Sequence, residues 1–165
     1  MHEMELIGVR VELPSNAPIV LLREMAGESR LLPIYIGAPE ATAIALALDG
    51  VATPRPMTHD LLRDVLEELS ADVERIVVTE LRDKTFFAEL HLVRGKEHII
   101  VSSRPSDAIA LAVRTGTPIF AAEAVIDEAG YRESEDDVDE DQAEEVVEQF
   151  REFIDSISPE DFETE

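Results

Sequence analysis

Apolar and polar residues alternate in the first part of the chain, which is the pattern of half-buried β-strands. Segments that contain Pro, Gly, Ser and Asn separate the alternating stretches and favour turns. The pattern predicts three strands, at residues 4–13, 19–24 and 30–36. It returns in the middle of the chain and predicts three more strands, at residues 74–81, 85–93 and 96–102.

Other segments have the apolar spacing of α-helices, at residues 38–49, 58–69 and 105–115. The first and third are rich in Ala, and each has Pro in its first turn and Gly just after its last turn, which is typical of helix ends. In the second helix we expect Thr58 to be the N-cap and Asp60 to lie in the positively polarised first turn.

The two halves of this region repeat each other. Residues 43–47 and 108–112 have the same sequence, Ala-Ile-Ala-Leu-Ala, and each copy follows three predicted strands. We therefore predict an α+β fold of two β-β-β-α units, with the helix at 58–69 as an extra element between them. The Ala-rich helices have little polar surface, so we expect them to be buried between sheets in β/α/β layers.

Acidic residues are concentrated at the C-terminal end. The chain has 14 Lys and Arg against 37 Asp and Glu, a net charge of −23. Residues 1–129 hold 12 basic and 21 acidic side chains (−9), and residues 130–165 hold 2 and 16 (−14). We predict a folded domain at 1–129, then an acidic linker and an amphipathic helix within 130–165. This segment could dock on its own domain or a dimer mate, bind a protein partner, or cover a basic groove.

Composition excludes several classes of protein. The chain has no Cys, which excludes disulfides, thiolate catalysis and Cys-ligated zinc. No apolar run approaches the roughly 18 residues of a membrane span, and the acidic start is unlike a secretory signal. We therefore expect a cytoplasmic protein without a membrane association. The net charge argues against a broad basic face for nucleic acid, so any phosphate binding has to be local.

Two stretches combine Arg-Pro with polar residues at a predicted helix start, at residues 54–60 and 102–107. Helix N-termini carry unpaired N–H groups that suit anions, and an Arg beside them can hold a phosphate with two parallel hydrogen bonds. The candidate phosphate-binding residues are Arg55, Thr58, Arg104 and Ser106. The alternative is a structural role, in which these residues cap helices.

The same stretches contain groups that could catalyse hydrolysis. His59 and Asp60 form the only adjacent His–carboxylate pair, and such a pair could ligate a metal or act as general base toward a phosphodiester. Asp107 opens the third helix, and Glu40 occupies the matching part of the first repeat, so both could line the same cleft. Offsetting a helix dipole is the structural alternative for Asp60 and Asp107.

Four stretches in this order are similar to the bifunctional nuclease family, at residues 32–37, 40–41, 55–60 and 104–112. The resemblance covers about residues 2–128. It implies a duplicated β-β-β-α fold, a homodimer, and nuclease activity on both RNA and DNA. Two positions depart from the family pattern, with Tyr35 in place of Trp and Ser102 in place of Asp in many members.

Two functions follow as hypotheses. The first is hydrolysis of RNA and DNA with Mg²⁺ or Mn²⁺, in which Arg55, Arg104, Ser106 and Thr58 hold or orient the substrate. Metal binding and proton transfer would then fall to the remaining candidates, with the first three as metal ligands: Asp60, Asp107, His59 and Glu40. The second is a non-catalytic binding or regulatory module. A two-metal centre needs convergent carboxylates around ions about 3.5–4 Å apart, so divergent carboxylates favour the module.

Overall fold

The computed structural model describes residues 1–132, so the predicted acidic linker and amphipathic helix lie outside the described residues. Each repeat unit is three antiparallel strands followed by a helix, as predicted. The first unit consists of β1 (His2–Glu12), β2 (Ala17–Glu24), β3 (Leu31–Tyr35) and α1 (Ala38–Leu48). The second consists of β4 (Asp72–Arg82), β5 (Thr85–Arg94), β6 (Glu97–Ser103) and α3 (Pro105–Thr115). The extra helix, α2 (Thr58–Glu68), lies between the units in the chain.

Two short elements that the sequence pattern did not predict complete the fold, β7 (Ile119–Ala121) and α4 (Glu123–Ala129). β7 pairs antiparallel with β1 and parallel with β4, so the strand order is β3-β2-β1-β7-β4-β5-β6. The α+β fold is therefore confirmed, and the two expected sheet layers are the halves of one seven-stranded sheet. None of the helices in residues 1–132 is long and apolar enough to cross a membrane.

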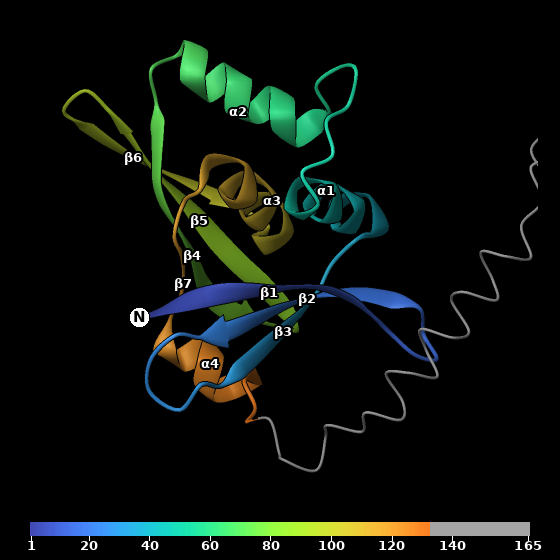
Figure 1. Cartoon of the computed structure of the whole chain (residues 1–165). Helices are drawn as coiled ribbons and strands as arrows, with labels where there is room; N and C mark the ends of the chain where they lie inside the picture. The colour runs from blue at the N-terminus through green and yellow to red at the C-terminus, as the bar shows by residue number, and fades with distance from the viewer. Residues whose placement is uncertain (133–165) are drawn as a thin grey trace, which may run out of the picture. The chain divides into compact units, whose positions relative to one another are not determined.

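The helices bring three N-terminal ends to one region of the molecule (Figure 1). Helix α1 packs on β1 and β2, helix α3 packs on β4 and β5, and α1 and α3 also contact each other. Helix α2 packs on α3, whereas α4 packs against β3 and β4. This arrangement places the starts of α1, α2 and α3, which carry most of the candidate site residues, within side-chain reach of one another.

The repeated pentapeptide is buried to different extents in its two copies. In α3 all five residues, 108–112, are buried, whereas in α1 only Ala43 and Ile44 are buried. Helix α2 packs on α3, which adds to the burial of the copy in α3. The expected burial of both Ala-rich helices is thus confirmed for α3 and is only partial for α1.

Candidate functional site

Each of the three central helices carries a carboxylate at its third residue: Glu40 in α1, Asp60 in α2 and Asp107 in α3. A negative charge in the first turn offsets the partial positive charge of the helix N-terminus. The side chains around these positions form two separate sets of contacts. Their partners decide which of the predicted residues act together.

Arg104, at the N-cap of α3, joins two of these carboxylates. Its Nε lies 2.7 Å from Oδ2 of Asp107, and its Nη2 lies 3.1 Å from Oδ1 of the same group. The same Nη2 lies 2.8 Å from Oε1 of Glu40. The Arg104 side chain is nevertheless 64% exposed, so its guanidinium is held by two acids while remaining accessible from solvent.

His59 completes this arrangement from α2. Its Nε2 lies 2.9 Å from Oδ1 of Asp107, and the residue is only 7% exposed. Burial acts to raise the pKa of the Asp107 carboxyl, but hydrogen bonds from Arg104 and His59 outweigh it and hold that pKa below its usual value. Glu40, His59, Arg104 and Asp107 therefore form one hydrogen-bonded group, the Arg104 cluster.

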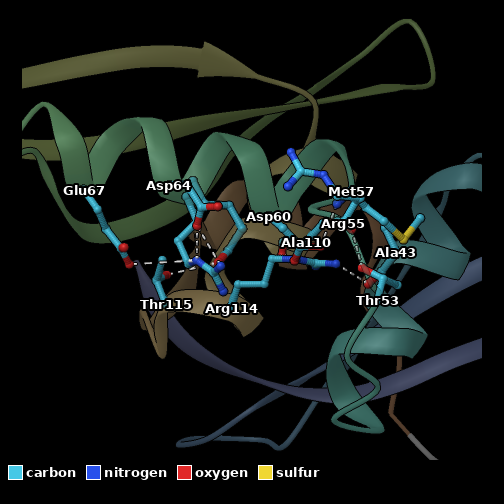
Figure 2. Close-up of polar contacts among 12 residues, drawn as sticks. Ala43, Thr53, Arg55, Met57, Asp60, Asp64, Glu67, Ala110, Arg114 and Thr115 are labelled. Atoms are coloured by element: carbon cyan, nitrogen blue, oxygen red, sulfur yellow. Dashed lines mark hydrogen bonds and ion pairs between the residues drawn. The ribbon is translucent and has the colours of Figure 1, made fainter.

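Asp60 belongs to the other set of contacts. Its Oδ1 accepts a hydrogen bond from Nε of Arg114 at 2.7 Å, and its Oδ2 accepts one from the Met57 N–H at 2.9 Å (Figure 2). Both bonds, that from Arg114 above all, hold the pKa of the Asp60 carboxyl below its usual value against the opposing effect of burial. The adjacent residues His59 and Asp60 thus have different partners.

Arg114 connects all three helices. Besides Asp60 in α2, its guanidinium donates to the carbonyl of Ala110 in α3 at 2.7 Å and to that of Ala43 in α1 at 3.0 Å (Figure 2). Its side chain is only 5% exposed. Arg114 is not among the residues predicted from the sequence, although it is the one charged side chain after the apolar run 108–113. Its contacts indicate a structural role in holding the helices together.

The low pKa of Asp60 predicts a loss of stability in acid. A carboxyl whose pKa is lower in the folded than in the unfolded chain stabilises the fold above its unfolded pKa, and this contribution disappears as the pH falls through the folded pKa. We expect the free energy of unfolding, measured in urea, to fall from about pH 5 downward. The stability difference between the parent and Asp60→Asn should narrow over the same range. A constant difference would contradict this assignment.

The remaining candidates differ in how they contact the rest of the protein. Arg55 is exposed, and its guanidinium has no partner among residues 1–132. Ser106 is buried at the second position of α3. The prediction that Thr58 caps α2 is wrong by one residue, because the Asp60 carboxylate holds the Met57 N–H and makes Met57 the N-cap. Thr58 is the first helical residue and is exposed.

The acidic residues do not form a cage for a metal in this arrangement. Among residues 1–132, no group of three or more His, Asp or Glu side chains is placed to hold an ion. The guanidinium of Arg104 lies between Glu40 and Asp107, and Asp60 faces Arg114 instead. The three carboxylates therefore do not converge as a two-metal centre requires. The use of Mg²⁺ or Mn²⁺ stays a prediction.

Two cavities lie on either side of these contacts. One, of about 430 Å³, is lined by apolar residues of α1, of the 50–57 loop and of α3, together with Asp60, Arg63 and Arg114. The other, of about 330 Å³, is bounded by Arg104 and Ser106, by the end of β3 and by the start of β5. The Arg104 cluster thus adjoins a cavity that can admit a ligand.

Comparison with known proteins shows which family the sequence matches. A family model described as "Bifunctional nuclease domain" matches residues 20–134, which include the whole Arg104 cluster. An uncharacterized protein of Mycobacterium tuberculosis is 46% identical over 165 residues, covering 98% of both chains.

Plant proteins with a functional name are also similar. Bifunctional nuclease 2 of Arabidopsis thaliana is 33% identical over 112 residues, which are 65% of this chain and 34% of the plant protein. Bifunctional nuclease 1 of Oryza sativa subsp. japonica is 27% identical over 116 residues, which are 68% of this chain and 34% of that protein. The chain thus corresponds to about a third of each plant relative.

Proposed function

The chain belongs to the bifunctional nuclease domain family, and from that premise we propose that it hydrolyses phosphodiester bonds of RNA and DNA at the Arg104 cluster. The observation that carries the proposal is the position of Arg104. Its guanidinium is exposed, lies at a helix N-terminus, and is held by two carboxylates that a phosphate could replace. Guanidinium groups bind phosphate in the same bidentate geometry that they use for carboxylate.

Exchange of partners by Arg104 would prepare the site for hydrolysis. When the guanidinium turns from Asp107 to a phosphate, Oδ2 of Asp107 loses its hydrogen bond at 2.7 Å and can accept a proton from water. His59 continues to hold Oδ1 of the same carboxylate and thereby fixes its orientation. Asp107 would then act as general base for a water whose oxygen attacks phosphorus, and the P–O bond to the leaving end of the strand would break as its oxygen takes a proton from solvent. His59 would position Asp107, and Arg104 would bind the phosphate and stabilise developing charge.

The other candidates would act at the edge of this site. Arg55, with its guanidinium unpaired among the described residues, would bind a neighbouring phosphate of the strand. Ser106 and the first-turn N–H groups of α3 would donate to the phosphate held by Arg104.

Glu40 would keep Arg104 in place between substrates. Asp60 contributes through its contacts with Arg114 and Met57 rather than at the reacting atoms.

A nuclease assay tests the proposed function. Purified protein is incubated with labelled RNA and DNA in EDTA, in Mg²⁺ and in Mn²⁺, and the His59→Ala/Asp107→Asn double variant is the control for contaminating nucleases. We expect the parent to cleave and the double variant to be inactive. Cleavage in EDTA would contradict the predicted metal, whereas activity restored only by Mg²⁺ or Mn²⁺ would support it. Equal cleavage by both proteins would contradict the assignment of the site.

A second candidate function is a non-catalytic binding module. It is favoured by one observation, namely that Asp60 does not join Glu40 and Asp107. Absence of cleavage by the parent under all three conditions, with binding of the same strands retained, would support the module and contradict the nuclease.

The oligomeric state and the C-terminal segment need separate experiments. We propose that the protein is a homodimer, which the family resemblance implies. We also propose that the acidic segment 130–165 binds a protein partner. Light scattering on the full chain measures the first, and a monomer would contradict it. Deletion of 130–165 tests the groove-covering alternative, because unchanged nucleic-acid affinity at low salt would exclude it.

A further inference from the structure

Two basic side chains line the cavity of about 330 Å³ beside the Arg104 cluster, in a protein that is acidic overall. Lys84, in the turn between β4 and β5, and Arg104 line it from two sides, and no acidic residue lines it. Lys84 is one of only two lysines in the chain, and its ammonium group has no partner among residues 1–132. An unpaired cation next to Arg104 suits a second anionic contact on the same ligand.

Ser106 provides a hydroxyl at the cavity wall. It lines the cavity and is only 6% exposed, and its hydroxyl has no hydrogen-bond partner among the described residues. Because this hydroxyl is accessible from the cavity, it is free to donate a hydrogen bond to an anion there. The first-turn N–H groups of α3 are beside it and have no acceptor within the helix. Together they provide donors for one phosphate group.

Two aromatic side chains form the remaining wall. Tyr35, at the end of β3, and Phe86, at the start of β5, both line the cavity. Tyr35 is 58% exposed, and its hydroxyl donates a hydrogen bond to Oε2 of Glu12 at 2.5 Å. This bond fixes an exposed ring, and exposed aromatic rings provide the surface on which unpaired nucleobases stack.

We propose that this cavity is a subsite for one nucleotide of a single-stranded nucleic acid. Arg104, Ser106 and Lys84 hold its phosphate, and Tyr35 and Phe86 contact its base. The inference rests on the proposed function and deepens it by specifying the form of the substrate. A base reaches these rings only when it is outside a duplex, because its faces are otherwise covered by neighbouring base pairs. The cavity volume is within the range of small-molecule sites, which begins at about 300 Å³.

Equilibrium binding tests the subsite apart from catalysis. The probe is a fluorescein-labelled single strand of six nucleotides with phosphorothioate linkages, which keep the charge and resist hydrolysis, measured by anisotropy with the full chain. We expect Tyr35→Ala to weaken binding about 5- to 150-fold, the range for the loss of one base–aromatic stack. Tyr35→Phe keeps the ring and loses only the hydrogen bond to Glu12, so it should weaken binding much less than Tyr35→Ala.

Lysine variants test whether Lys84 contributes to binding of the strand. Lys84 has a positive φ of 61°, so Asn is the replacement that the backbone tolerates. We expect Lys84→Asn to weaken binding and to reduce the slope of log affinity against log salt by about one. The matched control is Lys96→Asn, at the other lysine of the chain, which should leave both quantities unchanged.

Three outcomes would overturn the subsite. The first is that the parent does not bind the strand. The second is that neither Tyr35→Ala nor Lys84→Asn changes binding, although both variants remain folded. The third is that the same strand binds more tightly when it is annealed to its complement. Cleavage assays on ordinary strands separate this result from the proposed function. Binding that depends on Tyr35 without cleavage contradicts only the nuclease, whereas cleavage that does not depend on Tyr35 or Lys84 contradicts only the subsite.

Discussion

Replacing Arg114 with Met is expected to lower the free energy of unfolding by about 3–5 kcal/mol, the usual cost of breaking a buried ion pair from one side. Arg114 is 5% exposed and contacts Asp60 in α2, Ala110 in α3 and Ala43 in α1. The substitution leaves the Asp60 carboxylate without its cation and the carbonyl of Ala43 without its donor. Urea denaturation followed by circular dichroism measures the change.

A matched control is available on α2. Arg63 forms an ion pair with Asp64 at 2.7 Å, but both side chains are about a third exposed. We expect Arg63→Met to change the stability by no more than about 1 kcal/mol, as for other surface ion pairs. An equal effect of the two substitutions would contradict the structural role of Arg114.

A double variant shows whether the stability comes from the pair. Asp60→Asn combined with Arg114→Met removes both charges, and replacing both partners of a buried pair costs less than removing one. We expect the double variant to be more stable than Arg114→Met alone. If Asp60→Asn instead abolished activity without changing stability, Asp60 would be a catalytic residue, as the sequence pattern first suggested.

The pattern of residues predicted the repeat well because its signals are local. Strand alternation, turn residues and helix ends each depend on a few neighbouring positions, and the six strands and three helices they predict are present with bounds within two residues. β7 has only three residues, Ile119–Ala121, which is too short for an alternation to be recognised. Its place between β1 and β4 depends on contacts between residues far apart in the chain. The joining of the two halves was therefore not predictable from the pattern.

The sequence predicted which residues lie at the site but not which of them form hydrogen bonds with one another. His59 and Asp60 are adjacent in sequence, which suggested that they act as one pair. Neighbouring residues of a helix point in different directions, so they do not face a common ligand. In the structure His59 pairs with Asp107, and Asp60 pairs with Arg114. Only the packing of α2 on α3 determines these partners, and a single sequence carries no direct sign of it.

The His59–Asp107 pair leads to the largest expected effect on activity. We expect His59→Ala and Asp107→Asn each to lower kcat/KM about 10²- to 10⁴-fold, the range for loss of general-base catalysis. Because His59 acts through Asp107, the double variant should be no less active than the worse single variant. The control is Asp64→Asn, an α2 carboxylate outside the cluster, which should retain activity. Thermal unfolding of each variant separates loss of activity from loss of fold.

The pH dependence of the activity that remains in the His59 variant shows whether His59 positions Asp107 or only packs against it. The pKa of Asp107 is below its usual value because hydrogen bonds from Arg104 and His59 outweigh the opposing effect of burial. A general base works only when deprotonated, so in the parent kcat/KM should fall only below the ordinary pKa of Asp, about 3.9. Replacing His59 with Ala removes one of the lowering contacts and should move this acid limb to higher pH. An unmoved limb, or single effects that multiply in the double variant, would show that the two residues act independently.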